Sequence, residues 1–255
     1  MTVSEAGKIK VKSILISQPP PENDKNPYAE LARKHHLKID FRSFIYVDGV
    51  PGKELRKEKI NLADFTAVIF TSRTAIDHFF RICEELRHEM PAETKYCCNT
   101  ESTALYLQKY IQYRKRKIFF GKPGSTPLFD IVKKHSAEKF IFPCSDVSKD
   151  ELSSKMREAG YQVTDCVMYR TVCSDLSDLA DVNYDVIAFF SPSGIKSLFQ
   201  NFPDFAQNNT RIAAFGPSTH QAVRDAGLRL DIAAPRPEAP SMTMAIEEYV
   251  MNVNK

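Results

Sequence analysis

Residues 69–76 read IFTSRTAI, and residues 189–195 read FFSPSGI. Each stretch passes from an apolar strand, through small hydroxyl residues, into an amphipathic helix. A second match pairs STA at residues 102–104 with STH at residues 218–220. Because both matches occur in the same order in the two parts of the chain, the sequence predicts an internal duplication.

The spacing after the second match also repeats. Ser125 follows Thr103, and Ser241 follows Thr219, by the same 22 residues. The two copies are nevertheless offset along the chain. The first continues to a fourth strand–helix unit at residues 140–159, whereas the second stops after the helix that begins near Ser241.

The N-terminal segment, residues 13–36, supplies the unit that the second copy lacks. It reads strand, proline, polar loop and helix, as residues 140–159 do. We therefore expect one domain to be built from both ends of the chain and a second domain to be inserted as the middle. The chain must then cross between the domains twice.

Short apolar runs alternate with amphipathic helices along the chain, which predicts parallel sheets covered on both faces. The expected fold class is α/β, with two doubly wound parallel-sheet domains joined by a two-stranded linker. One strand is expected from Leu37 to about Tyr46, and the last strand at residues 212–215. The expected bounds are 1–43 plus 173–255 for the discontinuous domain, 53–165 for the inserted domain, and 44–52 and 166–172 for the linker strands.

Composition and motif content exclude several functions. The net charge of +3, from 35 basic and 32 acidic residues, is too weak to indicate nucleic-acid binding. No apolar run approaches the ~20 residues of a membrane span, and no signal peptide is expected. Phosphate-binding loops are missing and only nine glycines are present, which disfavours a nucleotide-dependent transferase. The basic run at residues 114–117 precedes a strand, so we expect it to be solvated surface.

Cysteine and histidine usage indicates a cytoplasmic protein without a metal. The six cysteines form no C-x-x-C pair and mostly lie in or beside apolar runs, so we expect buried, reduced thiols. The six histidines show no H-x-x-x-H or H-E-x-x-H spacing. No structural metal is therefore expected.

Hydroxyl side chains stand where several expected strands end and helices begin. Any one of them can be a helix N-cap, worth ~1 kcal/mol. Together they mark the carboxyl ends of parallel strands, where α/β sheets bind ligands and helix N-termini favour anions. A carboxylate-rich ligand is therefore expected. The residues are Thr71, Ser72, Ser102, Ser125, Ser191, Ser193, Ser218 and Ser241.

Three further residues have open roles. Arg73 lies in a strand-to-helix turn and Arg170 on an expected crossing, where each is either an anion ligand or ordinary surface. Tyr169 lies on the same crossing. Its ring suits packing, and its phenol can also donate a proton or hydrogen bond to a leaving hydroxyl.

Four further stretches stand in a fixed order along the chain: residues 140–144 (FIFPC), 167–171 (VMYRT), 189–194 (FFSPSG) and 214–219 (AFGPST). With these motifs, and with residues 69–72 and 102–104, the chain resembles the uroporphyrinogen-III synthase family. The resemblance extends from about Ile14 to Val250, and the ordered set of motifs is more specific than any one of them.

The resemblance implies two α/β domains joined by a pair of strands, with the active site in the cleft between them. It implies a lyase (hydro-lyase) that cyclises hydroxymethylbilane to uroporphyrinogen III in tetrapyrrole (haem) biosynthesis. Water is lost and ring D is inverted, and no metal or organic cofactor takes part. The bilane closes without enzyme, but to the wrong isomer, so much of the catalysis is expected to be geometric.

The resemblance also assigns residues. Tyr169 is the expected catalytic residue, which helps the substrate hydroxyl leave, and the family's paired threonines fall on Thr103 and Thr219. The expected substrate-binding residues are Thr71, Ser72, Arg73, Ser102, Thr103, Cys144, Ser145, Ser191, Ser193, Gly194, Ser218 and Thr219.

Two positions depart from the family pattern. Gln18 stands where many members carry arginine, and Thr100 where many carry glycine.

The expected partner is the linear tetrapyrrole, with no nucleic acid and no membrane. A monomer is expected, with transient contact to hydroxymethylbilane synthase. The alternative function is a non-catalytic two-lobed binding module for a carboxylate-rich small molecule.

Overall fold

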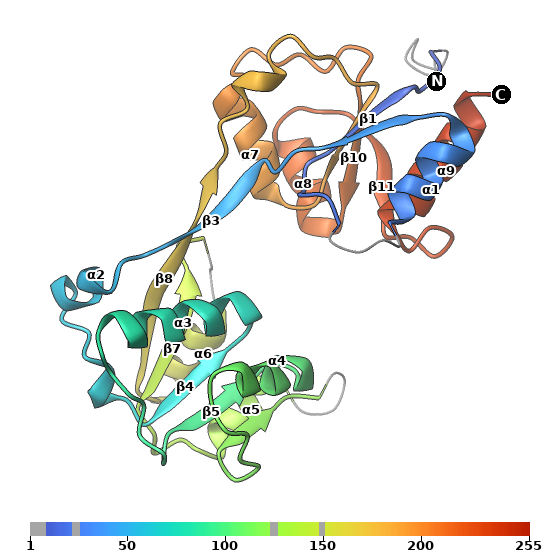
Figure 1. The fold of residues 1–255 in the computed structure, drawn as a ribbon. Helices are drawn as coiled ribbons and strands as arrows, with labels where there is room; N and C mark the ends of the chain where they lie inside the picture. The colour runs from blue at the N-terminus through green and yellow to red at the C-terminus, as the bar shows by residue number, and fades with distance from the viewer. Residues whose placement is uncertain (1–8, 22–25, 123–126, 148–150) are drawn as a thin grey trace. The chain divides into compact units, whose positions relative to one another are not determined.

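The computed structural model describes residues 9–21, 26–122, 127–147 and 151–255 of the chain. The chain divides into two compact units (Figure 1). The terminal unit comprises Met1–Tyr46 and Val172–Lys255, and the central unit comprises Val47–Thr171. The chain therefore passes from one unit to the other after Tyr46 and returns after Thr171.

The terminal unit is built on a five-stranded sheet of order β11-β10-β9-β1-β2, in which neighbouring strands are parallel. The two described chain ends meet here, because Val11 and Asn254 exchange two hydrogen bonds of 2.8 Å. The elements are β1 (Ser13–Ile16), α1 (Pro27–His35), β2 (Lys38–Phe41), η4 (Ser177–Leu179), β9 (Val186–Phe189), α7 (Pro192–Asn201), β10 (Arg211–Phe215), α8 (Pro217–Asp225), β11 (Leu230–Ala234) and α9 (Met242–Val253).

The central unit carries a six-stranded sheet of order β3-β8-β7-β4-β5-β6, and its pairs from β8 to β6 are parallel. The elements are β3 (Ile45–Gly49), α2 (Gly52–Lys57), η2 (Leu62–Asp64), β4 (Ala67–Phe70), α3 (Arg73–Glu85), β5 (Lys95–Cys98), α4 (Glu101–Tyr106), η3 (Leu107–Lys109), β6 (Ile118–Phe120), α5 (Leu128–Lys133), β7 (Phe140–Ser145), α6 (Glu151–Glu158) and β8 (Val163–Cys173).

The two sheets share one strand order once the duplicated strands are matched. The order β8-β7-β4-β5-β6 of the central unit corresponds to β2-β1-β9-β10-β11 of the terminal unit. The N-terminal strand β1 therefore lies beside β9 as β7 lies beside β4. This is the arrangement that the offset duplication predicts.

Each sheet separates two apolar clusters, because its buried strands are apolar on both sides. In β4, Val68 and Phe70 face one cluster, while Ala67 and Ile69 face the other. In β1, Ile14 and Ile16 are likewise separated from Leu15. Near-continuous apolar strands of this kind are typical of parallel sheets with helices on both faces.

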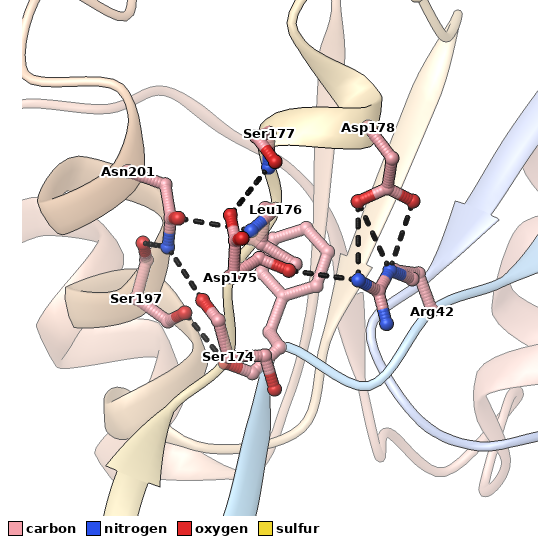
Figure 2. A network of polar contacts seen from close by, with 9 residues as sticks. Arg42, Ser174, Asp175, Leu176, Ser177, Asp178, Ser197 and Asn201 are labelled. Carbon is pink, nitrogen blue, oxygen red and sulfur yellow. Dashed lines mark hydrogen bonds and ion pairs between the residues drawn. The ribbon is translucent and has the colours of Figure 1, made fainter.

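A polar network holds the chain where it leaves and re-enters the terminal unit (Figure 2). The Phe44 carbonyl accepts hydrogen bonds from the Ser174 N–H, at 2.9 Å, and from the Ser197 hydroxyl. Asn201 donates to the Ser174 carbonyl and accepts from the Leu176 N–H, both at 2.9 Å. Because Ser197 and Asn201 both belong to α7, this helix fixes both crossing segments within the unit.

Three secondary-structure expectations were wrong. The single strand expected over residues 37–46 is broken, because Arg42 turns aside to pair with Asp178 and Phe44 is fully buried against Phe189. Strand β11 was missed because it is a half-buried edge strand interrupted by Asp231. Helix α2 was missed because its six residues, which overlap the expected linker strand only at Gly52, bury just Gly52 and Leu55 and so carry little apolar pattern.

The described cysteines are all free. Five are buried, and Cys173 is half-buried, so the expectation of burial fails at that position. Burial raises the pKa of the Cys83, Cys97 and Cys166 thiols to about 12, which keeps them protonated and unreactive. In the described part of the chain, no helix has the length and apolar character needed to span a bilayer.

Candidate functional site

In the central unit, the residues that follow parallel strands gather at one edge of the sheet. Thr71 and Ser72 follow β4, Thr100 follows β5, Ser145 ends β7, and Tyr169 lies opposite Ser145 in β8. The carboxyl ends of parallel strands lie along one end of the sheet, so the register brings these side chains together there. We call this line of strand ends and the turns that follow them the strand-end rim.

Ser72 is the N-cap of α3. Its hydroxyl accepts a hydrogen bond from the Ala75 N–H at 3.0 Å, as the sequence predicted. Thr71 is half-buried, and its carbonyl accepts a 2.7 Å hydrogen bond from the Asn99 side chain. The turn after β4 is therefore held from two sides, with its hydroxyl groups at the sheet edge.

A bulge in β8 sets the direction of the Tyr169 side chain. Cys144 pairs with Val167 and Ser145 with Tyr169, so Met168 is an extra residue on β8. A bulge of this kind redirects the side chains that follow it. Cys144 itself is buried, and Ser145 is half-buried.

The Tyr169 phenol lies between α3 and the apolar core of the central unit. Its ring stacks on His78, with ring centroids 5.0 Å apart and an interplanar angle of 19°. Its hydroxyl is 3.5 Å from the Ser72 hydroxyl, well beyond the ~2.7–2.8 Å of a strong O–H···O bond. The hydroxyl group is thus held in place but, among the described residues, makes only this weak contact.

Burial raises the pKa of Tyr169, a trend that the Ser72 contact opposes. The phenol is therefore neutral throughout the neutral pH range and keeps its proton available for donation. His78 shows the opposite trend. Burial and the nearby Arg81 guanidinium hold the pKa of His78 below 6.5, so its imidazole is neutral at pH 7.

Arg73 is exposed at the same rim, and its guanidinium carbon lies 5.3 Å from the centroid of the Tyr106 ring. The Tyr106 hydroxyl donates to the Asp77 carboxylate at 2.9 Å, and Lys109 pairs with that carboxylate at 3.0 Å. Asp77 therefore neutralises Lys109, whereas no ion pair of Arg73 is found among the described residues. Arg73 is accordingly a cation suited to meeting an anionic ligand.

The turn after β5 corrects one sequence expectation. Thr100, not Ser102, is the N-cap of α4, and its hydroxyl accepts from the Thr103 N–H at 3.2 Å. Ser102 lies exposed in the first turn of the helix. Thr103 is 5% exposed, and its hydroxyl contacts that of Thr100 at 2.9 Å. Thr100 thus caps the helix with its hydroxyl group, which a glycine at this position would lack.

The terminal unit has a matching rim. Ser191 is the N-cap of α7 and accepts from the Gly194 N–H at 3.3 Å, so Ser193 lies within the helix rather than at its cap. A Cβ on Gly194 would lie 3.3 Å from the Phe189 ring and 3.8 Å from the Ser17 hydroxyl. Glycine therefore lets α7 approach the ends of β9 and β1 closely.

The turn after β10 also differs from expectation. Its N-cap is Gly216, whose φ of 87° suits a residue without a Cβ, and Ser218 is exposed inside α8. Thr219 is only 1% exposed. The His220 ring nitrogen Nε2 donates to the carbonyls of Ala214 and Ala234, both at 2.9 Å, which joins the ends of β10 and β11.

The other described residues that the sequence singled out lie at a helix cap or on the surface. Ser241 caps α9, accepting from the Met244 N–H at 3.2 Å, and Ser125 lies outside the described residues. Gln18 and Arg170 are both exposed. In the basic run at residues 114–117, the first three side chains are exposed, and Lys117 is half-buried in an ion pair with Glu93. Among the described residues, no three His, Cys, Asp or Glu side chains form a group that could hold a metal.

Sequence reasoning missed His78 and Arg81, both on α3. His78 stacks on Tyr169, and the Arg81 guanidinium donates to main-chain carbonyls at Val50 and Met168. Their signal in the sequence is only their spacing of three residues, which places them on one side of a helix. No local pattern shows that this side faces Tyr169.

Fold and rim together define a duplicated α/β protein, permuted so that both chain ends build one unit, with hydroxyl side chains at the strand ends of each unit. The chain belongs to the uroporphyrinogen-III synthase family. The family model described as "Uroporphyrinogen-III synthase HemD" matches residues 26–244.

Individual relatives are more distant. A uroporphyrinogen-III synthase of Saccharomyces cerevisiae is 26% identical over 134 residues, 46% of this chain. The match spans about half, 48%, of that protein's length. The solved uroporphyrinogen-III synthetase of Helicobacter pylori has a TM-score of 0.60 at 17% identity, covering 94% of this chain and 99% of that one. A mutant uroporphyrinogen III synthase of Thermus thermophilus has a TM-score of 0.58 at 14% identity, with the same coverages. At these identities the two structures show the fold alone.

Proposed function

We propose that this chain is a uroporphyrinogen-III synthase, a lyase that closes hydroxymethylbilane to uroporphyrinogen III with loss of water and inversion of ring D. Family membership over residues 26–244 supports this activity. The observation that carries the proposal is the state of Tyr169. It is a neutral, partly buried phenol at the strand-end rim, and its hydroxyl makes only one, weak contact with the residues that the structure describes.

Tyr169 is the proposed catalytic residue. Loss of the substrate hydroxyl requires a proton, and a phenol with a raised pKa donates a hydrogen bond while remaining neutral. Because the bilane also closes unaided, the protein needs to supply mainly the geometry that directs attack to the substituted carbon of ring D. Acid assistance by Tyr169 then accelerates a step that the fold has already oriented.

The proposed substrate-binding residues fall into two groups by exposure. Thr71, Ser72, Arg73, Ser102, Ser145, Ser191, Ser193 and Ser218 are exposed or half-exposed and are suited to direct contact with substrate carboxylates. Thr103, Cys144, Gly194 and Thr219 are buried, so we propose that they shape the turns behind these contacts. A ligand with eight carboxylates suits many weak anion sites better than one strongly basic pocket.

The isomer of the product tests the proposal. Hydroxymethylbilane is generated in situ by its own synthase, with and without this chain, and the oxidised porphyrins are separated by chromatography. We expect the type III isomer with the chain and the type I isomer without it. Type I alone in both reactions would exclude the activity and favour a carboxylate-binding module, which equilibrium binding of the bilane then examines.

We also propose that the protein acts as a monomer in the cytoplasm and meets hydroxymethylbilane synthase only transiently. The free state of the described cysteines supports a reducing compartment. Sedimentation of the chain alone and mixed with the synthase checks the assembly. A stable dimer, or a complex that persists through the run, would contradict the proposal.

A further inference from the structure

We propose that Arg81 is a positioning residue for Tyr169, and that it acts through His78 and through the main chain of β8. This inference rests on the proposed function, in which the Tyr169 phenol assists the leaving hydroxyl. It adds a residue that neither the sequence motifs nor the strand-end rim includes.

The first route runs through the main chain. Arg81 Nη2 donates to the carbonyls of Val50, at 2.8 Å, and Met168, at 3.2 Å. The Val50 N–H also donates to the Met168 carbonyl at 3.0 Å. Met168 is the extra residue of the β8 bulge and directly precedes Tyr169. Arg81 therefore holds the peptide that sets the direction of the Tyr169 side chain.

The second route runs through the ring. Arg81 Nε donates to His78 Nδ1 at 3.2 Å, and the His78 ring stacks on Tyr169. A neutral histidine that accepts at Nδ1 carries its proton on Nε2, so this contact fixes both its tautomer and its ring plane. The Arg81 guanidinium thus acts on Tyr169 in two ways. It binds the Met168 carbonyl, which precedes Tyr169, and it orients the His78 ring that stacks on the Tyr169 ring.

The guanidinium occupies a confined slot. Arg81 Nη1 is paired with Glu85, whose other carboxylate oxygen accepts the Gly52 N–H at 2.6 Å. A Cβ on Gly49 would lie 2.9 Å from Arg81 Nη2, closer than side-chain carbons normally approach. A side chain at position 49 would therefore displace the Arg81 guanidinium from its present place.

The corresponding helix of the terminal unit, α7, binds main-chain carbonyls as Arg81 does but orients no tyrosine ring among the described residues. On α7, Ser197 and Asn201 also fix two crossing segments by binding the carbonyls of Phe44 and Ser174 (Figure 2). No stacked histidine–tyrosine pair is found there among the described residues. The main-chain anchor therefore recurs in both units, whereas the contact with the ring belongs to α3 alone.

A double-mutant cycle between Arg81→Met and Tyr169→Phe tests the proposal through kcat, KM and thermal stability. We expect Arg81→Met to lower kcat about tenfold with little change in KM when Tyr169 is present, because a misplaced acid mainly affects the transition state. In the Tyr169→Phe background, the same change is expected to lower kcat less than about twofold. An equal loss of kcat in both backgrounds would overturn the proposal.

Two further variants exclude a merely structural effect. Gly49→Ala displaces the guanidinium while keeping the side chains of the site, and we expect it to reproduce the Arg81→Met loss of kcat even if Arg81→Met folds poorly. Asn201→Ala removes the matched anchor on α7 and is expected to lower the melting temperature without coupling to Tyr169→Phe. Coupling of Asn201→Ala as strong as that of Arg81→Met would contradict a specific role for Arg81.

NMR of the His78 ring in the substrate-free protein tests the role of Arg81 independently of catalytic activity. The NMR signals of the His78 ring carry the ring-current shift of Tyr169 and the titration of the imidazole. Arg81, Asp77, Asp48 and the Tyr169 phenol are the titratable or charged groups that face it. In Arg81→Met we expect the ring-current shift to shrink and the pKa of His78 to rise towards 6.5.

An unchanged ring-current shift would overturn the proposal even if the wild-type chain makes the type III isomer. A wild-type chain that makes only type I, together with a shrunken shift, would instead contradict the proposed function.

Discussion

At the level of single residues, Tyr169 is the side chain whose surroundings best fit a step of the proposed reaction. Its ring is held by His78, its hydroxyl contacts Ser72 only at 3.5 Å, and burial raises its pKa. We predict that Tyr169→Phe lowers kcat by about ten- to a hundredfold, at or below the lower limit of the ~10²–10⁴-fold range for acid assistance, because the fold supplies most of the catalysis by orienting the substrate. Removing a weakly bonded hydroxyl leaves the stacked ring in place, so the melting temperature should barely change. Steady-state kinetics with an unchanged kcat would remove Tyr169 from the mechanism.

His78 provides a pH prediction. Its folded-state pKa is lowered, so below its ordinary value of 6.5 the unfolded chain takes up the proton first. The free energy of unfolding should therefore fall as the pH drops from about 6.5 through the folded pKa, with a slope of at most ~1.4 kcal/mol per pH unit from this group. His135 has a pKa shifted the same way and adds to the wild-type slope.

The variant His78→Gln isolates the contribution of His78. Urea unfolding at a series of pH values from about 7.5 to about 5 should give a shallower decline for the variant than for the wild type, since His135 titrates in both. Identical slopes in the two proteins would show that His78 titrates alike in the folded and unfolded states.

Single residues also show where sequence reasoning ends. The capping roles of Ser72 and Ser191 follow from the turn after a buried strand, and the structure confirms both. Ser102 and Ser218 occupy similar positions in the sequence, yet Thr100 and Gly216 are the caps. A cap is chosen by the backbone conformation at the strand end, which can shift by about two residues without changing the pattern of residue types.

At the level of elements, the strand-to-helix turns are expected to serve both stability and binding. Ser72→Ala and Ser191→Ala each remove an N-cap hydrogen bond and should cost ~0.5–2 kcal/mol in the free energy of unfolding. We predict that each also raises KM for the bilane several-fold, since each removes a hydroxyl from the proposed anion-binding rim. Urea unfolding and steady-state kinetics on the same preparations measure the two effects.

Asn61→Ala is the matched control for the two caps. Asn61 caps η2 by accepting the Ala63 N–H at 3.2 Å, and η2 precedes β4 at the amino end of the strand. The variant should lose stability with KM unchanged. A rise in KM equal to that of Ser72→Ala would show that the effect on KM follows from lost stability alone.

Most elements were predictable because their apolar patterns are strong. β4 and β9 are fully buried, and their four-residue apolar runs leave little choice of structure. β11 is half-buried, and its Asp231 accepts the Ile212 N–H from the neighbouring strand, which is a tertiary contact. At the break between β2 and β3, Arg42 pairs with Asp178, 136 residues away. Neither contact leaves a local signal in the sequence.

At the level of the whole molecule, the duplication predicts both sheets and assigns the N-terminal strand to the second copy. The shared strand order confirms that assignment, because β1 stands beside β9 where the central unit has β7 beside β4. The duplication does not predict the differences between the copies. The His78–Tyr169 stack lies in the central unit, and the main-chain anchor is made by Arg81 in that unit but by Ser197 and Asn201 in the terminal unit.

We propose that this duplicated, permuted fold is a catalyst that sets the isomer of a tetrapyrrole. The most direct test supplies hydroxymethylbilane in large excess over the chain and measures type I and type III porphyrin as the chain concentration increases. We predict that the type III fraction rises towards unity and that many type III molecules form per chain. A type III yield that never exceeds one molecule per chain, or a type I fraction that does not change, would contradict the account.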